Sequence, residues 1–391
     1  MNIEREKYNI LNYGPSDTGI GNLLRMSLEM DDIKIKSANV FPGFNRQNVE
    51  ESLVGKNAVQ CLERLTAFDW DTGAPYNTSY AFALALEDVV GESAPMAAQL
   101  MRMSLSEISR IKGHLTSIQS IASLISFGPI TNLLSETIAP FHKILLLADD
   151  TYKMRPFGFE NSFSEAFIDH LKKTLDWFEK KLDQLSKKLL RNPIFKMRTV
   201  DIGLISKGEC LSMGITGVAL RASGGQWDLR HKAPYDAYHH ISFQVSIGTV
   251  GDAYERTALR IEEMRQSIVI IRQCLDLLVE DAFPMSCLGK QIVQKNLDKQ
   301  SSSAVMKYAC SLHKGVFLPR KHLHKKIEGI RGETSVFAGV QEDQYTLDNV
   351  NIRTGAYFKF QAVEFLLRGY MYTDIGVILA SFDINTKEAD R

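Results

Sequence analysis

Apolar residues recur at three- and four-residue steps from about residue 50 onward, which indicates helices. The clearest case is the segment 93–125, where Ser93 is a plausible N-cap and Pro95 suits the first turn. Its apolar positions form one stripe: Met101, Leu105, Ile108, Ile111, Leu115, Ile118, Ala122 and Ile125. The pattern therefore predicts a long helix with one buried face.

Two further segments have the same periodicity. One begins at the capping box Ser162-x-x-Glu165, ends at Asn192–Pro193, and has a second face rich in Lys and Asp. Its apolar row is Leu171, Leu175, Phe178, Leu182, Leu185 and Leu189. The other runs from about 254 to 280, with the row Ile261, Met264, Ile268, Ile271, Leu275 and Leu278. Three long amphipathic helices predict a helical bundle at the centre of the molecule.

The remaining patterns divide the chain. Residues from about 8 to 45 resemble short strands with turns, and the pattern after about 325 is again short and strand-like. We expect five regions: an N-terminal β region 1–50, a first bundle part 51–200, an irregular central segment 201–253, a second bundle part 254–325 and a mixed α/β region 326–391.

Composition excludes some classes of protein. The 46 basic and 46 acidic side chains cancel, which argues against a non-specific nucleic-acid binder. No apolar run is long enough for a membrane span, since Arg272 and Asp276 interrupt the most apolar segment. The first ten residues have neither the pattern of a signal peptide nor that of a transit peptide. Five cysteines without a C-x-x-C pair fit a reducing compartment and provide no zinc or iron–sulfur ligand set.

The stretch NYGPSDTGIGN, residues 12–22, has the glycines of a phosphate-binding loop. A P-loop needs Lys and Ser or Thr after its last glycine, whereas Asn22 and Leu23 follow here. A dinucleotide fingerprint needs a helix after the glycines, whereas the pattern that follows alternates like a strand. We therefore interpret the stretch as a β-hairpin connection.

The densest signal lies in the central segment, GITGVALRASGGQWDLRHKAPYDAYHHISF, residues 214–243. Irregular segments of this length inside a compact domain are usually functional or bind partners. Arg221, Asp228 and Arg230 are candidates for a buried charge cluster that fixes the segment. His239 and His240 invite a metal interpretation, but no acidic or thiol ligand stands at a helpful spacing, so we interpret them as surface or partner-facing residues.

These motifs resemble a known family. GITGVALRASGGQWDLR, APYDAY, GDAYERTALRIEEMRQS, LSEISRIKGHL and the terminal EADR are similar to the D subunit of proton-pumping NADH:quinone oxidoreductase, respiratory complex I. The resemblance covers nearly the whole chain and is strongest from about 200 to 275. It implies an α+β, mainly α fold like that of the nickel–iron hydrogenase large subunit, a helical bundle with small flanking β elements. A hydrogenase itself is excluded, because the two metal-binding C-x-x-C motifs are missing.

The resemblance also implies partners and a location. This chain would bind no cofactor and would pack on the B-type subunit, which holds a [4Fe-4S] cluster, with the quinone headgroup site between the two subunits. C-type and membrane-arm subunits would be further partners, and no nucleic acid would be bound. The chain would lie peripherally on the inner membrane, on the cytoplasmic side in bacteria or the matrix side in mitochondria.

The quinone-site motifs depart from the family. The family's two loop histidines fall on Asp17 and Gly21, its quinone-binding tyrosine falls on Thr72, and its partner aspartate falls on Leu124. Arg46 keeps one cluster-side arginine, while a second falls near Trp70 and is missing. Gly and Leu offer no polar side-chain atom and a Thr hydroxyl is too weak an acid, so these positions cannot protonate a quinone as imidazole and phenol do.

Three hypotheses follow. The chain is a complex I subunit with a degenerate quinone site, or one with a remodelled active site. Alternatively it is a non-catalytic structural paralogue that serves as an assembly platform elsewhere. A second D-type chain with both histidines in the same genome would favour the paralogue.

Overall fold

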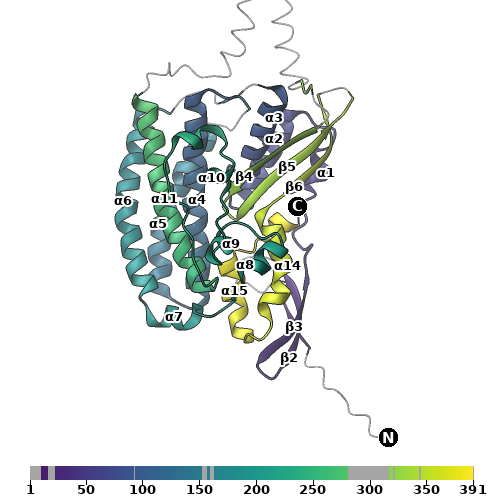
Figure 1. Cartoon of the computed structure of the whole chain (residues 1–391), viewed down its shortest axis with the longest axis vertical. Coiled ribbons are helices and arrows are strands. Elements are labelled where there is room, and N and C mark those ends of the chain that lie inside the picture. The colour runs from purple at the N-terminus through teal and green to yellow at the C-terminus, as the bar shows by residue number, and fades with distance from the viewer. Residues whose placement is uncertain are drawn as a thin grey trace, which may run out of the picture.

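The structure is a computed structural model, and it describes residues 10–15, 23–91, 93–151, 156–158, 163–280, 317–319, 322–342 and 345–390. Four long helices run side by side (Figure 1): α4 (Met96–Leu124), α5 (Gly128–Thr151), α6 (Glu165–Leu190) and α11 (Ala253–Glu280). The leucine and phenylalanine row of α6 is buried throughout, as the pattern predicted. The predicted bundle and its third helix from about 254 to 280 are thus confirmed, and α5 is a further member that the pattern did not reveal.

Two predicted helix starts are wrong. The N-cap of α4 is Pro95, and Ser93 is exposed two residues before it, because residues 94 and 95 are held outside the helix. The amide of Ala94 donates to the Glu87 carboxylate at 3.4 Å, and the Gln99 side chain donates to the Ala94 carbonyl at 2.6 Å. Ser164 caps α6 by accepting a hydrogen bond from the amide of Phe167, while Ser162 lies outside the described residues.

The environment of α4 also differs from the prediction of one buried stripe. This helix packs against α5, α11, the 3₁₀ helix η2 (Asp236–His240) and α15 (Ile375–Phe382), so almost its whole circumference is buried. The polar residues that the pattern placed on the solvent side are therefore inside: Arg102, Glu107, Arg110 and His114. Such charges need partners, since burying an unpaired charge is costly. They form the networks described below.

Two antiparallel three-stranded sheets flank the bundle. The first contains β1 (Ile10–Tyr13), β2 (Arg25–Asp31) and β3 (Lys34–Phe41), in that order. Because β1 and β2 are antiparallel neighbours, the stretch between them joins two strands, as the hairpin interpretation predicts. The second sheet contains β4 (His322–Gly329), β5 (Gly332–Val340) and β6 (Leu347–Arg353), and it lies against α3 (Thr78–Val90).

Short helices complete the fold. Before α3 come α1 (Val49–Leu53) and α2 (Ala58–Asp71). The helix α7 (Pro193–Thr199) precedes the central segment, which contains α8 (Lys207–Ser212), α9 (Val218–Ala222) and α10 (Leu229–Lys232), followed by η2. The C-terminal part contains α14 (Gly355–Leu367), η3 (Tyr372–Asp374), α15 and α16 (Thr386–Ala389). None of the helices in the described part of the chain is both long and apolar enough to cross a bilayer.

Candidate functional site

The turn that contains Thr72 is fixed by a buried carboxylate. Asp69, in the last turn of α2, accepts hydrogen bonds from the backbone amides of Asn77, Thr78 and Ser79 at 2.8–3.0 Å and from the hydroxyls of Thr78 and Ser79 at 2.6 Å. Burial raises the pKa of Asp69 to about 6, although these donors favour its charged form. The carboxylate thus caps the N-terminus of α3 from a distance. As a result, residues 72–76 form a rigid link between α2 and α3.

A cavity of about 260 Å³ opens beside this turn. It lies among the end of α2, one face of α4, the β4–β5 turn and the end of α15. Its lining is mostly polar or charged and consists of Asp71, Thr72, Gly73, Lys112, Gly113, Thr116, Ser117, Ser120, Arg331, Ala380, Asp383, Ile384 and Asn385. The Asn385 side-chain amide donates to the Thr72 carbonyl at 2.8 Å, which ties the C-terminal wall of the cavity to the α2 turn.

The Arg46 segment borders the same region. The carboxylate of Asp390 accepts hydrogen bonds from the amides of Gly43 and Asn45, at 2.7 and 2.9 Å, and Gln47 donates to Asp71 at the cavity rim. Arg46 itself points outward, with 63% of its side chain exposed, and pairs with Glu51 at 2.9 Å. The structure therefore brings the segments of Arg46 and Thr72 together, although 25 residues separate them in the sequence.

Among the described positions of the family's quinone motifs, Leu124 is not part of this lining. Leu124 ends α4 one turn beyond Ser120 and packs on α15, so closely that a methyl group added to Gly376 would lie 2.9 Å from Leu124 Cδ2. Asp17 and Gly21 lie outside the described residues. Thr72 is buried, and its hydroxyl donates to the Asp69 carbonyl at 3.1 Å. Of these four positions, the structure thus places Thr72 in the cavity wall.

Sequence reasoning named Thr72 and missed the other residues of the cavity lining, among them the cation Lys112. Lys112 projects from α4, half-buried, and its Nζ lies 5.8 Å from the ring centroid of Trp70. A cation therefore stands next to position 70, but it comes from α4. In the sequence, Lys112 follows the apolar residue Ile111 of the predicted helix. A lysine next to an apolar stripe usually lies on the solvent-exposed face, so the pattern did not identify Lys112 as a cavity residue. Its place in a cavity depends on the fold.

The predicted charge residues of the central segment meet in the interior. Arg221 Nε donates to Glu263 Oε1 on α11 at 2.7 Å, and Arg221 Nη1 donates to Glu328 Oε1 on β4 at 2.6 Å. Asp228 Oδ2 lies 3.9 Å from Arg221 Nη1 and 2.6 Å from Arg230 Nη2. All five side chains are at most 3% exposed. We call this set, together with Glu107, the central charge cluster.

Two glycines allow α9 to approach the second sheet closely enough for these charges to pair. Gly217 is the N-cap of α9 with φ +73°, and a Cβ there would lie 2.6 Å from the Cα of Gly332, the first residue of β5. The close approach of the two backbones positions Arg221, one turn along α9, against Glu328 at the end of β4. A side chain at either glycine would separate α9 from the sheet.

Glu107 on α4 completes the cluster. Its carboxylate accepts hydrogen bonds from Arg230 Nη1 at 2.9 Å, Tyr238 at 2.8 Å and Ser267 at 2.6 Å, and it also pairs with Arg110 at 3.2 Å. Burial alone would raise the pKa of Glu107, but the charges of Arg230 and Arg110 outweigh it and lower this pKa to about 2. The cluster therefore joins α4, α9, α10, α11 and β4 through ionised groups.

A second buried cluster lies at the other end of η2. Arg102 on α4 pairs with Glu87 at 2.6 Å and with Asp236 at 2.9 Å, and the Tyr80 hydroxyl donates to Asp236 at 2.5 Å. The APYDAY motif is thus bound to the bundle at Asp236 and at Tyr238. The arrangement holds the irregular segment in one conformation and engages both of these side chains in structural hydrogen bonds.

The depressed pKa of Glu107 predicts an acid-sensitive fold. A carboxyl group with a lower pKa in the folded state contributes stability above its unfolded value, 4.5, and this contribution disappears as the pH falls towards 2. The difference corresponds to about 3 kcal/mol in the free energy of unfolding. We expect Glu107→Gln to be less stable than the parent chain at pH 7 and to lose less stability between pH 5 and pH 3. Denaturant unfolding at several pH values measures this.

The exposed Glu51→Gln variant is the matched control, and it should keep the pH profile of the parent chain. Parallel pH profiles for the parent chain and Glu107→Gln would show that Glu107 does not carry this acid sensitivity.

The two histidines that invited a metal interpretation are both exposed. Their rings lie 3.9 Å apart, and His239 Nδ1 lies 3.0 Å from the Asp236 carbonyl oxygen. In the described ranges, no three His, Cys, Asp or Glu side chains are grouped as metal ligands. The central segment therefore contributes charge pairs to the interior and presents its histidines at the surface.

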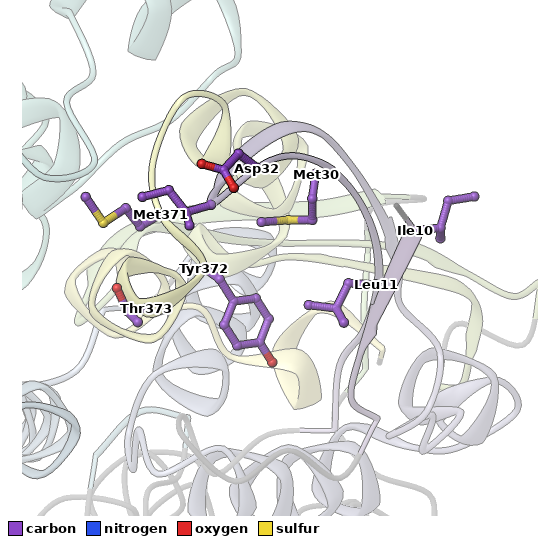
Figure 2. A pocket seen from close by; sticks show the side chains of 8 residues that line it. Ile10, Leu11, Met30, Asp32, Met371, Tyr372 and Thr373 are labelled. Atoms are coloured by element: carbon purple, nitrogen blue, oxygen red, sulfur yellow. The ribbon is translucent and has the colours of Figure 1, made fainter. Parts of the chain in front are cut away.

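A larger groove, of about 530 Å³, lies at the first sheet. Figure 2 shows its walls, which come from β1, from the β2–β3 turn and from η3. Its side chains are Ile10, Leu11, Met30, Asp32, Ile33, Met371, Tyr372 and Thr373. Five of them are large apolar residues with 38–57% exposure: Ile10, Leu11, Ile33, Met371 and Tyr372. Contiguous exposed apolar surface of this kind is typical of contacts with other macromolecules.

Comparisons with known proteins point to one family. A family model described as "Respiratory-chain NADH dehydrogenase, 49 Kd subunit" matches residues 150–391. The chain is 32% identical to the D subunit of the NADH-quinone oxidoreductase of Xanthobacter autotrophicus over 389 residues, which are 97% of this chain and 96% of that protein. The D subunits of the same enzyme from Brucella anthropi and Mesorhizobium japonicum are 32% and 31% identical, over 97% of this chain and 98% of theirs.

Proposed function

The chain belongs to the 49 kDa, or D, subunit family of NADH-quinone oxidoreductases, and from this premise we propose that it is a peripheral-arm subunit of complex I that supplies structure but not quinone chemistry. In this proposal it packs on the iron–sulfur B-type subunit and lines the quinone cavity. The [4Fe-4S] cluster belongs to that partner, and quinone is the substrate of the assembly. The chain itself holds no redox group.

The observation that carries the proposal is the composition of the cavity beside Thr72. A quinone headgroup needs hydrogen bonds to two carbonyl oxygens and a group that gives up a proton near neutral pH. The described lining contains neither an imidazole nor a phenol. It also contains no aromatic ring, and Ile384 is its one large apolar side chain, whereas pockets for ring-shaped ligands are usually lined by apolar groups.

Two buried clusters support the structural role. They fix the central segment between α4, α11 and β4, and they fill the interior with paired charges. Such an arrangement suits a segment that presents a constant surface to a partner. The apolar groove at β1 and η3 would be a contact for another subunit of the peripheral or membrane arm, because it is too exposed for an isolated chain.

A remodelled active quinone site is the alternative within the same assembly. Lys112 favours it, since an ammonium group could donate a hydrogen bond to a quinone oxygen. A paralogue that acts as a platform in another assembly is a second alternative. It would share the clusters but would associate with a different partner.

Co-purification tests the proposal. A tagged copy expressed in its native host is expected to elute with an iron–sulfur B-type subunit, identified by mass spectrometry and by the cluster's electron paramagnetic resonance signal. Tyr372→Asp should reduce the yield of the groove's partner, because it places a charge in an apolar contact. Val269→Asp, at a similarly exposed position on α11, is the matched control. Elution as an isolated monomer would refute the assembly, and a different set of partners would favour the paralogue.

A further inference from the structure

The cavity beside Thr72 contains a positive charge that has no counter-ion among the described residues. No carboxylate of the described residues lies within 4.0 Å of Lys112 Nζ, in contrast to Lys36, Lys325 and Lys387, which all pair with acids. Lys112 is held away from bulk water on one side by Trp70. Burial lowers the pKa of Lys112, and the charge of Arg331 lowers it further.

The acids near the cavity are already in use. Asp383 lies 3.1 Å from Arg331 Nε, and Glu388 lies 2.6 Å from Arg331 Nη1. Asp71 pairs with Lys387 at 2.7 Å on the rim. The four charged side chains of the lining, Asp71, Lys112, Arg331 and Asp383, therefore cancel, and Lys112 is the cation among them that has no carboxylate of the described residues within 4.0 Å.

A buried lysine lies behind the wall and interacts electrostatically with Arg331 and Asp383. Lys359 is only 1% exposed, and burial lowers its pKa to about 7. The charge of Asp383 opposes this shift, whereas Arg260 and Arg331 add to it. Burial also lowers the pKa of Arg260. Cations that crowd one another in this way are stabilised when an anion enters between them and the solvent.

The remaining lining suits a small polar ligand. The hydroxyls of Thr116 and Ser120 already donate to helix carbonyls, at 2.9 and 3.1 Å, so their oxygens are left as acceptors. Lys112 supplies donors, and the Asn385 amide uses one of its two N–H groups for the Thr72 carbonyl. A ligand that matches these donors and acceptors has a negatively charged oxygen and a hydroxyl group.

We propose that this cavity binds a small oxyanion that carries a hydroxyl group, with Lys112 as its ion-pair partner. Hydrogen phosphate and a short hydroxycarboxylate share this chemistry. The inference concerns this chain alone and holds whether or not the chain assembles into complex I.

The test is calorimetric titration of the full-length chain with sodium phosphate and, separately, with sodium lactate, against sodium chloride at matched ionic strength. We expect binding of at least one of the two oxyanions. Lys112→Gln should weaken it about tenfold or more, because a charge-assisted hydrogen bond is lost, while Lys112→Arg should retain most of it. Lys36→Gln, which removes a paired surface lysine on β3, should bind like the parent chain.

A second measurement separates binding from folding. Since Lys112 has no acidic partner among the described residues, Lys112→Gln should leave the thermal midpoint unchanged or raise it in chloride buffer. Binding of only phosphate or only lactate would support the proposal and identify which of the two classes of oxyanion the cavity binds. Equal affinity of the parent chain and Lys112→Gln, or no binding of either probe, would overturn it.

Discussion

Replacing Arg221 by methionine is expected to destabilise the fold by about 3–5 kcal/mol, because two buried glutamates lose their shared cation. Arg221 donates to Glu263 at 2.7 Å and to Glu328 at 2.6 Å, and none of the three side chains is more than 3% exposed. Methionine fills a similar volume, so the loss is mainly electrostatic. A change of this size is a large part of the stability of a typical domain, so assembly should fail as well.

Denaturant unfolding of the purified chain, or its soluble yield if the variant does not fold, measures this effect. Arg46→Met makes the same chemical change at an exposed ion pair and should alter the free energy of unfolding by no more than about 1 kcal/mol. Equal, mild effects of both variants would show that water reaches the central charge cluster. His240→Ala, at an exposed position, should also be mild.

The helices with regular apolar rows could be predicted because their burial is a local property of the sequence. The row of α6 from Leu171 to Leu189 repeats at helical spacing and is fully covered in the bundle. In contrast, α5 begins with Gly128 and Pro129 and contains Pro140, which lacks an amide donor. Its sequence therefore resembles an interrupted segment rather than one long helix. Packing against α4 and α6 compensates for the missing helical hydrogen bonds.

The charge cluster could be predicted only in part. Arg221, Asp228 and Arg230 stand close together in a conspicuous segment, so their proximity could be inferred from the sequence. Their partners Glu263 and Glu328 are 42 and 107 residues away from Arg221, and only the fold brings them near. The charged positions of α4 gave a misleading signal, because a helix covered on almost every side has only a narrow solvated face.

The candidate site shows the same limit. Family motifs led to Thr72. Lys112 stands inside the motif LSEISRIKGHL but at none of the quinone-site positions, and its place in the cavity depends on Gly73 and Arg331, which line the same cavity. A lysine without a nearby acid cannot be recognised until the neighbours from α2, the β4–β5 turn and α15 are in place.

Restoring the missing groups is expected to restore quinone chemistry. The triple variant Gly21→His, Thr72→Tyr and Leu124→Asp returns an imidazole, its carboxylate partner and a phenol to the family positions. Positioned proton donors typically contribute a factor of about 10²–10⁴ to a rate, so the quinone-dependent turnover of the purified assembly should rise by about a hundredfold or more. The matched control is Gly21→Leu, Thr72→Phe and Leu124→Asn, which adds similar volume without the acids.

Equal turnover in the two triple variants would show that these positions do not govern the reaction. A rise in the first variant alone would identify the lost side chains as the cause. Both variants require that the turn held by Asp69 keeps its shape, which circular dichroism and the presence of the B-type partner would report.

The most direct test of the account is NADH oxidation by the purified native assembly, with this unmodified chain as its only D-type subunit. The account predicts that a water-soluble artificial acceptor is reduced, which shows that electrons enter the assembly, while quinone is not reduced above background. Robust quinone reduction that a quinone-site inhibitor abolishes would contradict it and would establish a remodelled active site.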